Sequence, residues 1–156
     1  FCSPEARERL ESRLMLFYTR VTRDASEVLA EQAKKTPEKF SVLREMKGLV
    51  DPMRDVVSGG ADLAEFGRIL HRGWLLKRSV TSSISSPAID GYYESALQAG
   101  ALGGKLLGAG SGGFLLFYVE PEKQAAVAEA LRDLYRMRFR FDSGGTRITY
   151  YDQTIY

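Results

Sequence analysis

Apolar and polar positions alternate with two different periods along this chain, and these periods predict both strands and helices. A short apolar and aromatic run over 14–18 is typical of a strand. Apolar residues then recur at helical spacing within three stretches, 25–29, 42–57 and 63–74, with charged residues between them. The first half of the chain therefore predicts one strand followed by several helices.

Capping residues, prolines and glycines divide these helical stretches. Asp24 and Glu27 have the spacing of a capping box, and Thr36-Pro37 is a second helix start with proline at the first helical position. Pro52 lies inside the helical pattern and is predicted to kink or interrupt it. The pair Gly59-Gly60 is predicted to end this stretch before a third helix begins.

The second half of the chain predicts four strands and two helices around a glycine-rich turn. Ser86-Pro87 begins a helix that ends at Gly100, and two strands then flank the turn, the second of them over 114–119. A helix is predicted from Pro121. Apolar and arginine residues alternate over 137–141, which indicates a half-buried strand, and a last strand is predicted over 146–151.

When the inserted helices are set aside, the predicted order is β-α-β-β-α-β. This order is that of a ferredoxin-like α+β fold with an antiparallel sheet and helices on one side. The extra helices follow the first strand, and an extra strand is added at the C-terminus. With 156 residues, one domain is expected over 1–156.

The composition excludes several classes of protein. The net charge of +2 does not favour nucleic acid, and no apolar run approaches the roughly 20 residues of a membrane span. The only cysteine, Cys2, cannot form an internal disulfide, which fits a cytoplasmic protein. The only histidine, His71, has no cysteine or histidine partners, so no metal site is expected. Since residues 1–5 contain no methionine and no signal sequence, we expect a fragment of a longer chain.

The segment 103–113 carries the clearest chemical signal, because seven of its eleven residues are glycine or alanine. Glycines allow positive φ and a close approach to other groups, and successive N–H groups in such a turn can cradle a phosphate. The glycines fit G-x-G-x-x-G, but they lead into a strand and not into the helix that a dinucleotide-binding loop requires. Lys105 lies too early for a Walker A loop. A hairpin that merely packs two strands closely therefore remains as the alternative.

The stretch 66–118, with its string LHRGWLLKRSVTSSISSPAIDGYYESALQAGALGGKLLGAGSGGFLLFY, resembles the C-terminal half of the GHMP sugar kinases. Within that family it is most similar to the bacterial kinases of D-glycero-D-manno-heptose 7-phosphate, and more distantly to fucokinases and galactokinases. The segment from Lys105 to Gly113 matches the third motif of the family. The flanking strings LMLFYTRVTRDASEVL and FDSGGTRITYYD extend the resemblance over nearly the whole chain.

The resemblance implies one half of a two-domain, ATP-dependent enzyme that uses Mg²⁺ and phosphorylates the anomeric hydroxyl of a heptose 7-phosphate. The missing N-terminal domain would carry the main ATP loop and an acidic residue beside the acceptor, so we expect no catalytic residue here and no activity from this fragment alone. The loop expected to border the nucleotide and substrate phosphates consists of Lys105, Gly108, Ala109, Gly110, Ser111 and Gly112. Ser83 and Ser85 are candidate contacts for sugar hydroxyls, whereas helix capping alone explains Ser86.

Two positions depart from the family pattern. Ser111 stands where the family usually has glycine, and Arg20 follows Thr19 where glycine is common. Serine is small, so we expect the loop conformation to survive if φ at Ser111 is negative. Arg20 makes the fit at the first strand less close.

Two further alternatives stay open at this point. The acceptor could be the sugar of a fucokinase or a galactokinase, because selection of the acceptor depends on the missing half. The chain could also be a ferredoxin-like module without chemistry of its own, which binds a small regulatory ligand or mediates dimerisation. A homodimer is compatible with either function.

Overall fold

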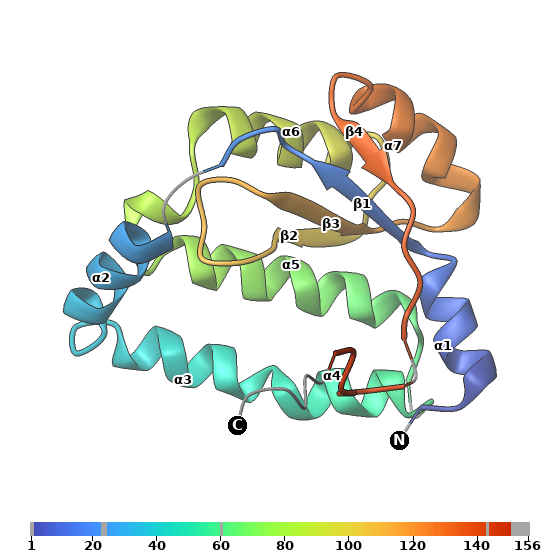
Figure 1. The fold of residues 1–156 in the computed structure, drawn as a ribbon, viewed down its shortest axis with the longest axis horizontal. Coiled ribbons are helices and arrows are strands. Elements are labelled where there is room, and N and C mark those ends of the chain that lie inside the picture. Colours follow the sequence, from blue (N-terminus) through green and yellow to red (C-terminus); the bar gives the residue numbers. More distant parts are fainter. Residues whose placement is uncertain (1, 23–24, 60, 143, 151–156) are drawn as a thin grey trace.

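The computed structural model describes residues 2–22, 25–59, 61–142 and 144–150, and it shows an α+β fold (Figure 1). One four-stranded antiparallel sheet lies between helices on its two sides. The helices are α1 (Pro4–Glu11), α2 (Ala25–Lys35), α3 (Phe40–Gly48), α4 (Val50–Val57), α5 (Ala64–Arg78), α6 (Pro87–Gln98) and α7 (Gln124–Ala130), with short 3₁₀ turns η1 (Ser82–Ile84) and η2 (Pro121–Lys123). The strands are β1 (Leu14–Tyr18), β2 (Gly103–Leu106), β3 (Phe114–Tyr118) and β4 (Tyr135–Met137).

The sheet has the strand order β2-β3-β1-β4, and every neighbouring pair is antiparallel. Helices α2 to α6 separate β1 from β2, and α7 separates β3 from β4. This arrangement confirms the predicted β-α-β-β-α-β order with helices inserted after the first strand. Figure 1 shows α6 and α7 on one side of the sheet, α5 on the other side along β2, and α3 and α4 beyond α5. The prediction that all helices lie on one side was therefore wrong.

The C-terminal part of the chain contains less strand than predicted. Strand β4 ends at Met137, and the described residues of 138–150 contain no further strand, so the extra C-terminal strand is not found. Because β4 pairs with β1 in the register Met137 to Leu16, Phe141 would lie opposite Ser12, where α1 ends and no strand is available. The amide of Phe141 instead donates a hydrogen bond to Glu11, 2.7 Å away. Alternation along a sequence predicts a strand but does not supply its partner.

The helical stretch 42–57 is interrupted as predicted. Helix α3 ends at Gly48 and α4 begins at Val50, with Leu49 between them. The ring of Pro52 would clash with the carbonyl of Gly48 in a continuous helix, which explains the position of the break. Thr36-Pro37 lies in a turn and α3 begins only at Phe40, so the predicted helix start was wrong. The predicted capping box of Asp24 lies outside the described residues.

The core lies mainly between the sheet and helices α6 and α7. Phe17 and Phe117 of the central strands, Trp74 of α5 and Tyr93 of α6 are almost fully buried in one cluster. Helix α5 approaches β2 unusually closely, because a Cβ atom at Gly103 would lie 2.0 Å from the carbonyl oxygen of Gly67. This contact lies near the first turn of α5, and the last turn of the helix reaches the connection between β2 and β3 through Lys77, whose Nζ donates to the carbonyl of Gly108.

Two negative observations hold for the described part of the chain. No helix there combines the length and the apolar character that crossing a bilayer requires. No group of three or more histidine, cysteine, aspartate or glutamate side chains is gathered there as a metal ion would need. His71 instead lies beside Tyr93, with 2.9 Å between Nδ1 and the tyrosine Oη.

Candidate functional site

The glycine loop, residues 107–113, connects β2 to β3 and is anchored at three points. The amide of Leu107 donates to the carbonyl of Phe114 at 2.8 Å and closes the base of the loop. The amides of Ser111 and Gly113 donate to the carbonyls of Ile84 and Val21, each at 2.8 Å. The loop is therefore held between the segment after β1 and the turn η1.

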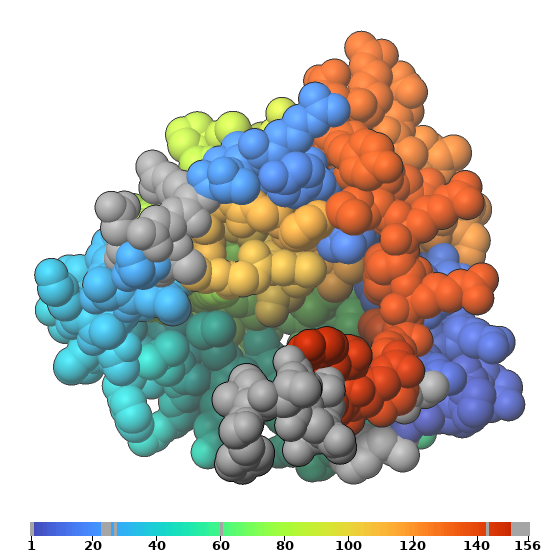
Figure 2. All heavy atoms as spheres, in the orientation of Figure 1, coloured from blue at the N-terminus to red at the C-terminus, as the bar shows by residue number. Residues whose placement is uncertain are grey.

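The remaining amides of the glycine loop are free. Among the described residues, the N–H groups of Gly108, Ala109, Gly110 and Gly112 donate no hydrogen bond. These residues line a hollow of about 450 Å³ together with Tyr18, Val21, Thr22, Leu107, Gly113 and Phe114. Figure 2 shows this gold-coloured region at the surface, next to the blue residues that follow β1. The loop thus meets the geometric requirement for an anion site, and it is not enclosed within the sheet.

Gly110 cannot be replaced without moving the backbone. Its φ is 137°, and a Cβ atom there would lie 2.8 Å from both the Cα atom and the carbonyl oxygen of Ile84. Both the conformation and the contact with η1 therefore require glycine at this position.

Ser111 corrects one expectation. Its φ is 60°, so the backbone is left-handed and not in the negative-φ conformation expected from the sequence. The side chain is 3% exposed, and its hydroxyl donates a short hydrogen bond to the carbonyl of Ser83. Arg20 has φ 58°, and these two are the non-glycine residues of positive φ in the described chain. Both residues thus have a conformation that favours glycine, and Ser111 is held in it by the hydrogen bonds of its amide and its hydroxyl.

Two lysines lie beside the glycine loop. Nζ of Lys77, in the last turn of α5, donates to the carbonyl of Gly108 at 2.6 Å. Burial lowers the pKa of Lys77, and the nearby positive charge of Lys105 on β2 lowers it further. In the part of the chain that the structure describes, neither lysine forms an ion pair with a carboxylate.

Both lysines line a groove of about 330 Å³ next to the loop. Figure 2 shows this hollow between the gold residues of the sheet and the teal helices α3 and α4, with green α5 at its floor. Its other walls are apolar and carry no carboxylate: Met46, Leu49, Val50, Met53, Ile69, Leu70, Gly73 and Trp74.

The two candidate serines lie differently with respect to the loop. Ser83 is joined to it, because its carbonyl accepts the hydroxyl of Ser111. The hydroxyl of Ser85 donates to Asp90 at 2.7 Å, and it lines a separate hollow of about 480 Å³. Asp90 also pairs with Arg78 at 2.6 Å. The structure therefore brings Ser83 to the loop but not Ser85.

Helix α2 contributes two residues that the sequence analysis missed. Nε2 of Gln32 donates to the carbonyl of Ala109 at 3.2 Å. Hydrogen bonds from Ser83 and Thr81 lower the pKa of Glu31. Gln32 follows the buried Val28 by four residues, a spacing that places both on the inner face of the helix and that could have identified Gln32.

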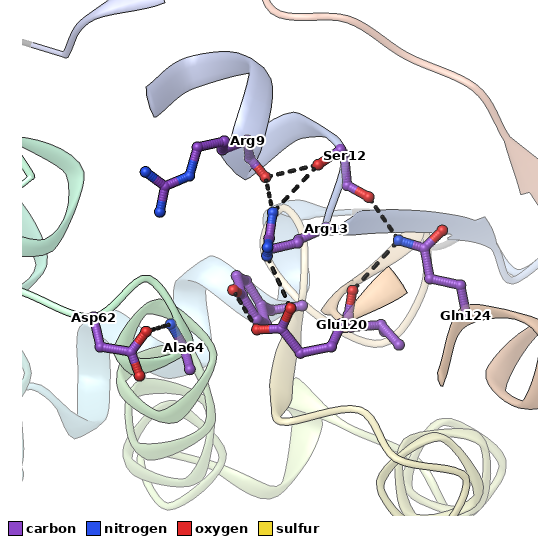
Figure 3. Close-up of polar contacts among 9 residues, drawn as sticks. Arg9, Ser12, Arg13, Asp62, Ala64, Glu120 and Gln124 are labelled. Carbon is purple, nitrogen blue, oxygen red and sulfur yellow. Dashed lines mark hydrogen bonds and ion pairs between the residues drawn. The ribbon is translucent and has the colours of Figure 1, made fainter. Parts of the chain in front are cut away.

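The opposite end of the sheet carries a polar network in which the groups satisfy one another (Figure 3). Glu120 accepts from Nε of Arg13 at 2.9 Å and from the hydroxyl of Tyr118 at 2.9 Å. Gln124 donates to the carbonyl of Ser12 at 2.6 Å. Burial raises the pKa of Tyr118, and the acceptor Glu120 raises it further. This network joins the end of α1, the end of β3 and the start of α7, and it satisfies Arg13, Tyr118 and Glu120 within the protein.

Comparison with known proteins supplies the context for this geometry. The family model described as GHMP kinases C terminal matches residues 54–136. The chain is 30% identical over 142 residues to the D-glycero-alpha-D-manno-heptose 7-phosphate kinase of Campylobacter jejuni, with 88% of this chain and 42% of that protein covered. It is 32% identical over 117 residues to the L-fucokinase/L-fucose-1-P guanylyltransferase of Bacteroides fragilis, and the match covers 72% of this chain and 12% of that protein.

Solved structures of other proteins share the fold of this chain. The mevalonate kinase of Methanococcus jannaschii superposes with a TM-score of 0.71 at 22% identity, with 86% of this chain and 41% of that chain covered. In each of these comparisons the chain spans less than half the length of the protein that it matches. The functions of the matched proteins therefore belong to longer polypeptides.

Proposed function

Because this chain belongs to the GHMP kinases, whose C-terminal family model matches more than half of it, we propose that it completes the active site of an ATP-dependent sugar kinase. GHMP kinases are ATP-dependent kinases, and heptose phosphate kinases and other sugar kinases are relatives of this chain. The observation that carries the proposal is the set of four glycine-loop residues whose amides donate no hydrogen bond among the described residues and which line a hollow beside the sheet.

Phosphoryl transfer needs alignment of the two reactants and neutralisation of charge on the transferred group, usually with Mg²⁺. The free N–H groups of Gly108, Ala109, Gly110 and Gly112 can hydrogen-bond phosphate oxygens, with no side chain at the three glycines to obstruct the approach. The loop that carries these amides is fixed by the hydrogen bonds of Ser111 and Gly113, so the amides need little rearrangement when the ligand binds. The loop is thus suited to bind phosphate oxygens of ATP or of the substrate while Mg²⁺, when bound, neutralises charge.

We infer that the acceptor is a heptose 7-phosphate, phosphorylated at its anomeric hydroxyl. The support is the similarity to the Campylobacter jejuni kinase over 88% of this chain. A fucokinase-type reaction is the second candidate, because the Bacteroides fragilis relative is similarly identical over 117 residues. In either reaction, a separate N-terminal domain would supply the main ATP loop and the groups that act on the acceptor hydroxyl. We expect the enzyme to act in the cytoplasm, and this chain alone to be inactive.

The test is a coupled assay of the full-length enzyme with ATP, Mg²⁺ and a panel of sugars and sugar phosphates. Gly110→Val should lower kcat/KM by about 100-fold, because it displaces the donor amides from the transferred phosphate. Gly91→Ala is the matched control, since a Cβ atom at Gly91 meets nothing within 4 Å. Unchanged activity of Gly110→Val would remove the loop from the active site. Absence of turnover with every acceptor would favour the ligand-binding module without chemistry, which calorimetry with the same compounds would then detect.

A further inference from the structure

Lys77 and Lys105 place two positive charges at one groove without a carboxylate to neutralise them. Other cations on the same helix are paired: Arg68 with Glu65, Arg72 with Glu45 at 2.6 Å, and Arg78 with Asp90 at 2.6 Å. Among the described residues of α5, Lys77 is therefore an exception, because it faces Lys105 of β2 and forms no ion pair.

The surroundings of the lysine pair increase the cost of leaving it without an anion. Apolar groove walls such as Met53, Leu70 and Trp74 lower the local dielectric constant and so strengthen electrostatic interactions nearby. Burial lowers the pKa of Lys77, and the like charge of Lys105 lowers it further, so the charged form of Lys77 is disfavoured in this place. A bound anion would reverse the penalty, because it hydrogen-bonds to both ammonium groups.

Lys77 retains donors for such an anion. An ammonium group carries three N–H bonds, and the described structure uses one of them, in the 2.6 Å hydrogen bond to the carbonyl of Gly108. That bond also fixes the ammonium group at the edge of the glycine loop. Lys105 has no hydrogen-bond partner among the described residues, so all of its donors are available.

The anion site and the glycine loop belong to two separate hollows. The free amides line the hollow on the Tyr18 and Phe114 side, whereas the lysines line the groove between β2 and helices α3 to α5. One phosphate contacting the amides and another contacting the lysines would therefore occupy neighbouring but different places. A substrate that carries a hydroxyl at one end and an anionic group at the other fits this arrangement. Its reacting hydroxyl would be directed to the loop and its anionic group to the lysines.

We propose that Lys77 and Lys105 bind the phosphate group that the acceptor already carries, and so select a phosphorylated sugar over a free one. This inference rests on the proposed kinase function and identifies the class of acceptor within it. The two relatives differ in this respect, since the name of one specifies a heptose 7-phosphate and the name of the other a fucokinase. The lysine pair assigns this chain to the phosphorylated class.

The test uses the full-length enzyme with Lys77→Gln and Lys105→Gln, and with Lys123→Gln as a control on the exposed turn η2. Each groove variant should raise KM for the sugar phosphate about tenfold, because it removes a charged hydrogen bond, and should change KM for ATP less than twofold. Inorganic phosphate should inhibit the wild type in competition with the sugar phosphate but not with ATP, and this inhibition should weaken in both variants. The control should behave as the wild type.

The outcomes separate the two claims. A raised KM for ATP with an unchanged KM for the acceptor would assign the lysines to the nucleotide and overturn this inference, while the kinase function would stand. Equal use of phosphorylated and free sugar by the wild type would also overturn it. If the wild type phosphorylates no acceptor at all, the kinase function itself fails and the inference falls with it.

Discussion

The two ends of the central strands differ in how their polar groups are used. At one end, Arg13, Tyr118 and Glu120 form a closed network in which each charge or hydroxyl has a partner. At the other end, the glycine loop exposes free amides next to the unpaired Lys77 and Lys105. The same sheet supports both ends, so the difference lies in the side chains and in the loop conformation.

The comparison teaches that the same sheet satisfies its polar groups at one end and leaves loop amides open at the other, which is the arrangement expected of a ligand site. The loop hydrogen-bonds to its neighbours through Ser111 and Gly113, and it leaves the intervening amides open. Ser111 keeps this arrangement although a left-handed conformation costs a non-glycine residue about 1–2 kcal/mol. A loop selected only for stability would have no reason to retain that cost.

Removing Glu120 should produce the largest change in stability. Glu120→Ala leaves the Tyr118 hydroxyl and the Arg13 guanidinium without their acceptor, and we expect a loss of about 2 kcal/mol. Urea unfolding of the full-length protein measures this, and kcat should not change, because the network lies at the end away from the loop. Glu129→Ala is the control, since its pair with Arg132 is 73% exposed on both sides and should contribute less than about 0.5 kcal/mol. A loss of activity without a loss of stability in Glu120→Ala would contradict the division between the two ends.

Replacing Lys105 should stabilise the protein, whereas replacing Glu120 destabilises it. Lys105→Met removes the repulsion on Lys77 and raises its pKa, so we expect the ligand-free protein to gain about 0.5 kcal/mol at pH 7. Because the folded-state pKa of Lys77 is below its unfolded value, the penalty is full at pH values below the folded-state pKa, shrinks as the pH rises through it, and vanishes above the unfolded-state pKa. Unfolding measured between pH 7 and 10 should therefore show a gain that shrinks with pH. A destabilised variant would mean that Lys105 has a stabilising partner and that the site is not electrostatically unsatisfied.

Replacing the two left-handed residues should change the stability by no more than replacing Lys105 does. Arg20 is exposed, and Arg20→Gly should stabilise the protein by about 0.5 kcal/mol, because glycine accepts φ 58° without the clash at Cβ. Ser111→Gly relieves the same strain but loses the hydrogen bond to Ser83, so its net effect should be near zero. Thermal unfolding of both variants in parallel provides the comparison. An equal gain in both would show that the Ser111 hydroxyl contributes nothing to the loop.

Local patterns in the sequence predicted most of the fold. Continuous apolar runs indicated β1 and β3, the capping of Ser86 indicated α6, and Pro52 indicated the break between α3 and α4. The end of β4 at Met137 could not be predicted, because it depends on where β1 begins far away in the sequence. Pairings across long separations, such as Arg13 with Glu120, leave no local signal for the same reason.

The candidate site was predictable in its backbone but less so in its side chains. The glycine content identified the loop, whereas the sign of φ at Ser111 depended on contacts with Ser83 and Ile84 that only the fold supplies. The contribution of Gln32 likewise depends on α2 packing against the loop. Ser85 was predicted as a sugar contact from the hydroxyl-rich loop around it, and that contact stays a prediction; its hydrogen bond to Asp90 had no local signal.

Amide hydrogen exchange in the full-length enzyme tests the central claim most directly. With a non-hydrolysable ATP analogue, Mg²⁺ and the sugar phosphate bound, exchange at Gly108, Ala109, Gly110 and Gly112 should slow strongly, because these amides acquire acceptors. Exchange at 118–120 should stay the same, because that end is already satisfied. Loop amides that exchange equally fast with and without ligands, in an enzyme shown to be active, would contradict the assignment of the glycine loop to the phosphates.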